Sequence, residues 1–282
     1  MNKQQWIVTG SALALLIALF LFGRTKPGPG NKGTSAAAQT EASRSLNVND
    51  LITELKKGLN PVSIARITAL ENSVIRGDVK SQKSAVYAEL ASFWKDSAQQ
   101  AIPYLWYTGE AAKLENSEKK LNFAAHSYLE ELRGYQDPEI KRWMAVQAND
   151  LFNRSLRIQP ADDSARIGLG STYFFGGGGD APPMEGIMKI REVAERDSTN
   201  MFAQFMLGYG SMVSGQYSKA TERFSKVVDA QPGNKEAVFL LAESFERSGD
   251  RKQAAKWFRV GRSLVDNPEV VRAIDEKLKT LE

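Results

Sequence analysis

The chain of 282 residues contains no cysteine and a single histidine, His126. Without cysteine the protein can form neither disulfides nor thiolate metal sites, and it has no cysteine nucleophile. A lone imidazole, with no cysteine and no second histidine in the chain, makes a metal site improbable. We therefore expect no metal and no cofactor. The lack of cysteine fits a reducing and an oxidising compartment equally well.

A strong excess of charge of one sign is also missing. The chain has 37 Lys and Arg against 33 Asp and Glu, a net charge of +4. That charge is too dilute over this length to predict nucleic-acid binding, and we expect no nucleic-acid partner. No serine lies in a nucleophile-elbow setting, and no pair of carboxylates stands out from the many surface ones. The sequence thus predicts a protein that is not an enzyme.

One long uncharged run is present, residues 6–22, which begins at Trp6 and ends at Phe22. Its length is near the minimum that crosses the hydrocarbon core of a bilayer, and it has no small-x-small cleavage motif at its end. We expect a retained single-pass anchor in the cell inner membrane. Basic residues after the run slightly outnumber those before it, which favours a cytoplasmic folded part, but the opposite orientation stays open.

The composition changes after this run. Residues 23–45 are rich in Gly, Pro, Ser, Ala and Thr, which predicts a flexible linker behind a short tail, 1–5, and the anchor. Residues 46–116 then show two pairs of helical segments with hairpin lengths but few repeated landmarks. They carry aromatic side chains around Trp94 and Trp106. We expect degenerate helical hairpins there.

Spaced landmarks recur in the second half of the chain. Three of them repeat 34 residues apart: Leu207-Gly208, Ala220 and Phe224 return as Leu241-Ala242, Ala254 and Phe258. Leu169-Gly170 lies 38 residues before Leu207-Gly208, which is the same period plus a four-residue insertion in the glycine-rich loop. A fixed period in this range is typical of stacked helical hairpins, each too small to bury its own apolar face.

The pattern Leu-Gly-x-x-Tyr, then Ala-x-x-x-Phe, then Pro resembles the tetratricopeptide repeat, here in a membrane-anchored protein of the bacterial type. One departure is Gly186, which stands where the pattern favours alanine. The resemblance implies an all-α, right-handed superhelical solenoid of helix-turn-helix repeats with a C-terminal capping helix. The repeats would cover residues 117–162, 163–200, 201–234 and 235–266, with the capping helix at 267–282.

The resemblance also implies that a partner binds along the concave face, which is built from the first helix of each hairpin. Carrying that register across gives eight large apolar residues for a partner-binding groove: Ile167, Phe174, Phe175, Phe202, Phe205, Tyr209, Met212 and Phe239. Glu243, Glu246 and Arg247 share the face of the last of these hairpins. An apolar or helical protein segment would suit such a surface, whereas the alternative is that these side chains pack on one another.

Two functions therefore remain. The first is a non-catalytic protein-protein interaction scaffold at the membrane. The second is a structural or self-associating subunit of a membrane-bound assembly, with the aromatic pairs around Trp94 and Trp106 as the interface. The glycine run 176–179 lacks the Lys and Ser/Thr of a phosphate-binding loop, so we interpret it as an ordinary hairpin loop rather than an anion site.

Overall fold

The computed structural model describes residues 46–76, 79–176 and 182–281, and every regular element within these ranges is helical. Residues 46–282 form one compact unit. The helices are Val48–Lys56 (α3), Pro61–Arg76 (α4), Lys80–Ser92 (α5), Ala101–Glu115 (α6), Glu118–Gly134 (α7), Pro138–Ile158 (α8), Asp163–Phe175 (α9), Pro183–Arg196 (α10), Met201–Val213 (α11), Tyr217–Ala230 (α12), Lys235–Arg247 (α13), Arg251–Ser263 (α14) and Pro268–Leu281 (α15).

Some expectations fall outside these ranges. The predicted anchor, residues 6–22, and the predicted linker, 23–45, are not among the described residues, and neither is most of the glycine run 176–179. Among the helices that the structure does describe, none combines the length and the apolar character needed to cross a bilayer. The membrane anchor accordingly stays a prediction from the sequence.

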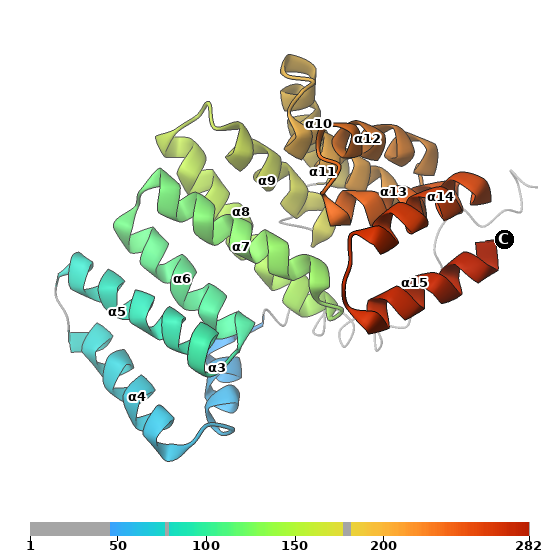
Figure 1. The fold of residues 1–282 in the computed structure, drawn as a ribbon. Helices are drawn as coiled ribbons and strands as arrows, with labels where there is room; N and C mark the ends of the chain where they lie inside the picture. The colour runs from blue at the N-terminus through green and yellow to red at the C-terminus, as the bar shows by residue number, and fades with distance from the viewer. Residues whose placement is uncertain (1–45, 77–78, 177–181, 282) are drawn as a thin grey trace, which may run out of the picture. The chain divides into compact units, whose positions relative to one another are not determined.

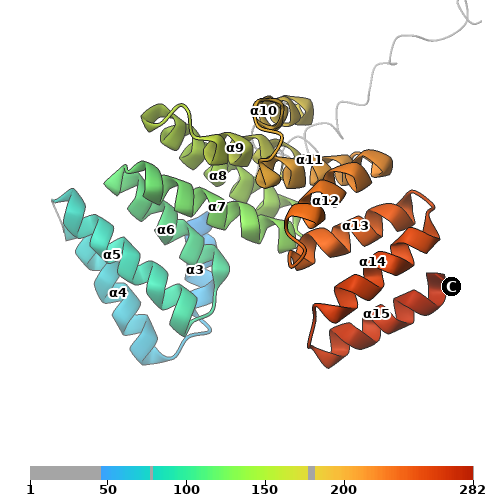
Figure 2. The ribbon, with the colours of Figure 1, turned by 45° about the horizontal axis from the view of Figure 1, so that its top comes forward.

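Successive helices pair into antiparallel hairpins. The pairs α5–α6, α7–α8, α9–α10, α11–α12 and α13–α14 pack along their lengths, and α15 packs on α14 (Figure 1). The first helices α7, α9, α11 and α13 also contact one another in turn, and we call their shared surface the first-helix row (Figure 2). The expected all-α architecture of stacked hairpins is confirmed, while the right-handed sense of the superhelix stays a prediction.

The helix starts repeat with the same period as the apolar landmarks. Asn200 and Asn234 lie 34 residues apart and cap α11 and α13, and each side chain accepts a hydrogen bond from the backbone N–H three residues on, at 3.0 Å. Asp162 caps α9 in the same way at 3.1 Å. Each cap satisfies one of the N–H groups that a helix start leaves without a partner. The local sequence therefore fixes where each hairpin begins.

Aromatic rings lie directly on glycines where helices cross. The Phe152 ring covers Gly168, Phe224 covers Gly208, and Phe239 covers Gly261. A Cβ atom on Gly208 would be 2.9 Å from the Phe224 ring, and one on Gly261 would be 2.6 Å from that of Phe239. These distances are shorter than van der Waals contact, so the missing side chain makes room for the ring.

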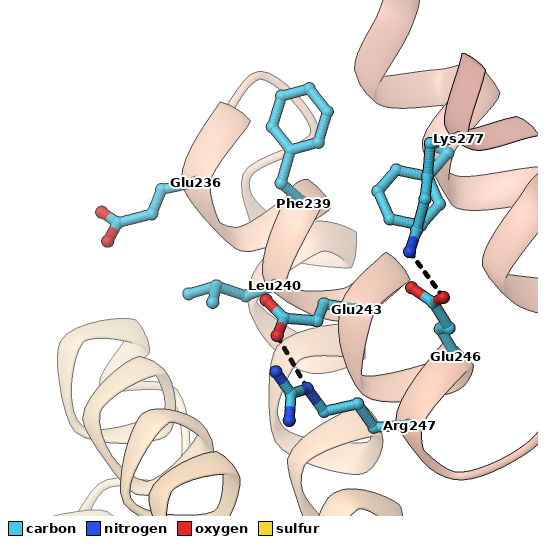
Figure 3. A pocket seen from close by; sticks show the side chains of 8 residues that line it. Glu236, Phe239, Leu240, Glu243, Glu246, Arg247 and Lys277 are labelled. Carbon is cyan, nitrogen blue, oxygen red and sulfur yellow. Dashed lines mark hydrogen bonds and ion pairs between the residues drawn. The ribbon is translucent and has the colours of Figure 1, made fainter. Parts of the chain in front are cut away.

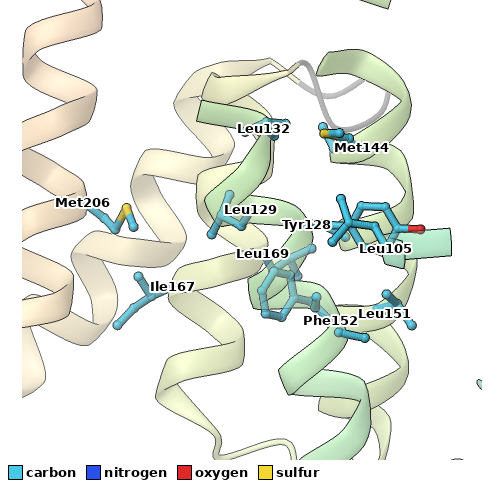
Figure 4. Packing of buried hydrophobic residues seen from close by; sticks show 14 of the residues in the cluster. Leu105, Tyr128, Leu129, Leu132, Met144, Leu151, Phe152, Ile167, Leu169 and Met206 are labelled. Carbon is cyan, nitrogen blue, oxygen red and sulfur yellow. The ribbon is translucent and has the colours of Figure 1, made fainter. Parts of the chain in front are cut away.

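The hairpins share one continuous hydrophobic core that runs from α3 to α13. Its centre lies between α6 and α11, where buried side chains from successive hairpins interdigitate (Figure 4). Leu105, Tyr128, Met144, Leu151 and Phe152 contribute from α6, α7 and α8, and each is at most 1% exposed. Because no hairpin buries its own apolar face, removing one would expose the core of its neighbours.

The N-terminal hairpin departs from the regular pattern. After α5 the chain makes a π-helical turn, Phe93–Ser97, and Gln99 follows with a left-handed φ of 52°. The next helix, α6, begins at Ala101, so Pro103 lies in its first turn, where the missing N–H removes no helical hydrogen bond. The proline is therefore accommodated at the start of α6.

A polar network joins α3, α4 and α6 at the N-terminal end of the described chain. Lys56 of α3 donates to Glu71 of α4 at 2.7 Å, and the hydroxyl of Tyr107 in α6 donates to the same carboxylate at 2.8 Å. Burial raises the pKa of Tyr107 well above its usual range, and the hydrogen bond to Glu71 adds to the shift. The hydroxyl therefore stays protonated and ties α6 to α4.

Candidate partner-binding surface

The eight side chains predicted for the groove all lie on α9, α11 and α13, but they do not share one environment. Ile167 is fully buried and faces Met206 between α9 and α11 (Figure 4). Phe205 is 7% exposed and packs edge-to-face on Phe224 of α12, with ring centroids 5.6 Å apart. Neither of these two offers surface to a partner. For them the structure shows the alternative, packing in the core, because flanking helices cover both sides of each first helix.

The other six are half-buried, and three of them form an aromatic run along the first-helix row. Phe174 and Phe175 end α9 with ring centroids 4.7 Å apart, and Phe175 lies 4.5 Å from Tyr209 of α11. Burial raises the pKa of Tyr209, opposed by Arg133, and Glu236 and Glu243 raise it further. The three rings, which we call the aromatic run, thus adjoin charged groups from α7 and α13.

An ion pair between α7 and α13 lies beside the aromatic run. Arg133 of α7 donates to the carboxylate of Glu236 in α13 at 2.7 Å, although 103 residues separate the two in the chain. Arg133 is one-fifth exposed and Glu236 about half exposed, so water screens much of the attraction. The contact shows that α7 and α13 approach each other across α9 and α11. No periodicity in the sequence predicts it.

A hollow lies at the C-terminal end of the row. It has a volume of about 780 Å³ and is lined by Glu236, Phe239, Leu240, Glu243, Glu246 and Arg247 of α13, Phe258 of α14 and Lys277 of α15 (Figure 3). Its glutamates are partnered, because Arg247 donates to Glu243 at 2.8 Å and Lys277 pairs with Glu246 at 2.6 Å. We call it the α13 pocket: an aromatic floor with a rim of ion pairs.

Residues on the α13 side of this pocket were predicted from the sequence to share one face, but the residues that α14 and α15 contribute were not predicted to belong to the site. Phe258 was identified as a repeat landmark, whereas Lys277 was not singled out. Both side chains reach the pocket because α15 packs on α14 at the end of the stack. A capping helix that contributes a side chain to such a pocket has no counterpart within a single repeat. The repeat pattern alone therefore could not predict it.

His126 fills a gap between three first helices. Its Nε2 lies 2.9 Å from the Ser164 hydroxyl, and its ring lies 4.9 Å from that of Phe152 and 5.7 Å from that of Phe202. Burial lowers the pKa of His126, although Asp162 and Glu130 oppose the shift. The histidine is thus a packing residue of α7, α9 and α11 that is held in its neutral form.

This environment predicts a loss of stability in weak acid. A histidine whose pKa is lower in the folded than in the unfolded state binds its proton preferentially after unfolding, so stability falls as the pH drops below the unfolded value of 6.5. We expect the urea midpoint of residues 46–282 to fall between pH 7.5 and 5.5 by more than it does in His126→Gln. Equal pH dependence in both proteins, or an imidazole resonance that titrates above pH 6.5, would contradict this.

The aromatic residues proposed for self-association are placed differently from expectation. Trp94 is fully buried in the core, so it cannot form an interface without unfolding of its surroundings. Trp106 is half-buried, with the Lys113 ammonium over its ring at 5.6 Å and the Trp143 ring 6.4 Å away. The two indoles therefore do not form a common exposed surface, and an interface centred on both is wrong for this structure.

Comparison with known proteins gives the fold. No family model and no curated protein sequence matches the chain. The solved structure of PilW, described as a widely conserved type IV pilus biogenesis factor, is 19% identical and covers 70% of this chain and 85% of its own, with a TM-score of 0.51. MamA from Desulfovibrio magneticus RS-1 is 20% identical, covering 67% and 96%, with a TM-score of 0.43.

A third structure is that of YrrB, described as a TPR protein with an unusual peptide-binding site. It is 15% identical and covers 74% of this chain and 98% of its own, with a TM-score of 0.42. The similarity to PilW extends over most of both chains, but at this identity it concerns the fold alone. Together with the 34-residue register it shows a fold of stacked helical hairpins.

Proposed function

We propose that the protein is a non-catalytic scaffold that binds an apolar or helical segment of a partner protein along the first-helix row. The observation that carries the proposal is the continuity between the aromatic run on α9 and α11 and the α13 pocket. Phe174, Phe175 and Tyr209 are half-buried rather than sealed, and Tyr209 adjoins Glu236 and Glu243 of the pocket rim. Partly exposed aromatic side chains next to a hollow are the usual anchors of protein interfaces.

The chemistry of the surface favours a segment with an apolar stripe. Phe239, Leu240 and Phe258 offer apolar area at the floor of the α13 pocket. The ion pairs Arg247–Glu243 and Lys277–Glu246 at its rim keep the charges satisfied when no partner is present. Such a rim contributes more to orientation and to the choice of partner than to affinity. An amphipathic helix or an extended chain with alternating apolar residues would fit this arrangement.

The proposed cellular location of the protein rests on its sequence alone. The uncharged residues 6–22 would hold the protein in the cell inner membrane, and residues 23–45 would separate that anchor from the helical unit. The flanking charges favour the cytoplasmic side. A reporter fused after the last residue and active on one side of the membrane would test this orientation directly.

Site-specific photo-crosslinking tests the binding surface. A benzoyl-phenylalanine placed at Leu240 of the full-length chain in cells should give a discrete adduct with a partner protein, because Leu240 lines the α13 pocket. The same group at Met188 of α10 is a matched control, because that side chain is 54% exposed but lies outside the first-helix row. Tyr209→Ser in the Leu240 background should reduce the adduct severalfold.

Three outcomes would overturn the proposal. No adduct from Leu240, or equal adducts from Leu240 and Met188, would remove the first-helix row as a specific surface. An adduct with twice the mass of the chain from Leu240 would instead support the self-associating subunit. Circular dichroism of each variant checks that the helical fold persists, so loss of crosslinking cannot be ascribed to unfolding.

A further inference from the structure

A second hollow lies between α10, α11 and α12, away from the first-helix row. It has a volume of about 350 Å³. Ser211 of α11 lines it and is two residues from Tyr209, so the hollow lies about 200° around α11 from the aromatic run. We call it the α10–α12 pocket. The side chains that the argument below uses come from all three helices: Met184, Ile187, Arg191, Leu207, Lys219 and Arg223.

The pocket lies where the repeat leaves out a side chain. In the repeat register Thr172 of α9 and Ser244 of α13 correspond to Gly210 of α11, and both are fully buried. A Cβ atom on Gly210 would meet nothing closer than Ile187, at 3.8 Å. Gly186 meanwhile brings α10 against the backbone of α9, and α10 packs less extensively on α11 than α8 does on α9. Space that is filled in the neighbouring hairpins is therefore open here.

Three cations line this pocket without a carboxylate of their own. Within the part of the chain that the structure describes, Arg191, Lys219 and Arg223 form no ion pair with an acidic side chain. Glu222 also lines the pocket, but it pairs at 3.2 Å with Lys226, which does not. The positive charge that faces the hollow is thus not compensated by the protein, and it would attract an anion.

Neutral amide groups hold two of these cations in place. Arg223 donates to Oε1 of Gln204 at 2.7 Å, and Gln204, which is 1% exposed, donates in turn to the backbone carbonyl of Ser198 at 3.0 Å. Lys219 donates to the side-chain oxygen of Gln216 at 2.6 Å. A neutral acceptor orients a cation without cancelling its charge. The guanidinium of Arg223 is therefore positioned by a buried side chain before any ligand binds.

We propose that the α10–α12 pocket binds a small organic anion, a short apolar chain that carries a carboxylate or phosphate head group. Arg191 and the free edge of the Arg223 guanidinium can hold such a head group by charge-assisted hydrogen bonds. Met184, Ile187 and Leu207 supply apolar wall for the chain. The volume of about 350 Å³ is at the lower end of the range for small-molecule sites. A ligand there would contact three helices at once.

Methionine methyl NMR tests this with the fragment 46–282, which forms one compact unit. Met184 lines the pocket, whereas Met144 is fully buried in the core, so methyl-labelled methionine reports on both places. We expect hexanoate and hexyl phosphate to shift the Met184 resonance saturably and to leave that of Met144 unchanged. Hexanol should bind at least about tenfold more weakly, because it lacks the charge. The tighter of the two anions identifies the head group.

Two variants separate the charge from the space. Arg223→Gln should weaken binding of the tighter anion by roughly tenfold. Arg157→Gln is its matched control, since it removes the same charge from an exposed position of α8 outside the pocket, and it should leave the affinity unchanged. Gly210→Thr introduces the residue that α9 carries at the corresponding position, and it should abolish binding by filling the pocket. Circular dichroism checks that each variant keeps its helical fold.

Several results would overturn the inference. One is the absence of a saturable shift at Met184, and another is equal affinity for hexanol and the anions, which would show an apolar hollow without selection for charge. A third is equal binding by Arg223→Gln and Arg157→Gln. Full binding by a folded Gly210→Thr protein would place the ligand elsewhere. The probes are small molecules and the pocket is separate from the first-helix row, so failure here is distinguishable from failure of crosslinking at Leu240.

Discussion

Gly186→Ala should lower the free energy of unfolding by about 3 kcal/mol, although alanine is the better helix former. Gly186 lies in α10 where that helix crosses α9, and a Cβ atom there would overlap the carbonyl oxygen of Gly170 and come within 2.8 Å of the Cβ of Tyr173. Backbone atoms on both sides cannot move away as a flexible side chain would. The overlap therefore outweighs the gain of about 1 kcal/mol in helix propensity.

The same substitution at Gly134 is the matched control. Gly134 is the last residue of α7, is exposed, and has nothing within 4 Å of the position of a Cβ atom. Gly134→Ala should leave stability unchanged or raise it by up to about 1 kcal/mol, because alanine restricts the unfolded chain more than glycine does. Urea unfolding of residues 46–282 measures both variants. A Gly186→Ala protein as stable as the parent would show that α9 and α10 can separate at this crossing.

Phe152→Ala should destabilise the protein by about 3–5 kcal/mol, the usual range for removing a fully buried phenylalanine. Its ring is inaccessible to solvent and fills the space between Gly168 of α9 and His126 of α7, with an edge-to-face approach to the imidazole at 4.9 Å. Removing the ring would leave a cavity at the junction of two hairpins. The thermal or urea transition should shift accordingly and remain cooperative.

A double-mutant cycle separates this contact from general loss of packing. A Cβ atom on Gly168 would come within 2.6 Å of Cε1 of Phe152, so Gly168→Ala should be destabilising by itself. Phe152→Leu removes part of the ring and should make room for the added methyl group. We expect the double variant to be more stable than the sum of the two single effects, by roughly 1–3 kcal/mol. Strict additivity would mean that the two residues do not meet.

Gly186 also shows a limit of the family pattern, which cannot explain its own exceptions. The tetratricopeptide pattern favours alanine at this position, and the sequence gives no reason for the departure. In the structure the carbonyl of Gly170 occupies the space where a Cβ atom would lie. The departure is thus a consequence of an unusually close crossing of α9 and α10. Only the separation of the two helices, which is a tertiary property, explains it.

The candidate surface was predictable to a lesser degree than the fold. The repeat register placed all eight groove residues on the correct helices, because helical spacing is a local property. It could not tell Phe205, which turns toward α12, from Tyr209, which stays at the surface. The difference depends on how far each helix is rotated against its neighbours. That rotation is set by contacts such as those of Phe224 on Gly208 and Ile167 on Met206.

The sequence by itself determined the helical hairpins, their period and their capped starts, because apolar spacing and N-cap side chains act over a few residues. It also determined that no disulfide or thiolate chemistry is available. Tertiary structure alone decided which aromatic side chains stay at the surface and how Arg133 meets Glu236 across the row. It decided as well that Lys277 completes the α13 pocket. Those outcomes depend on the angle and distance at which hairpins stack, and many side chains set these jointly.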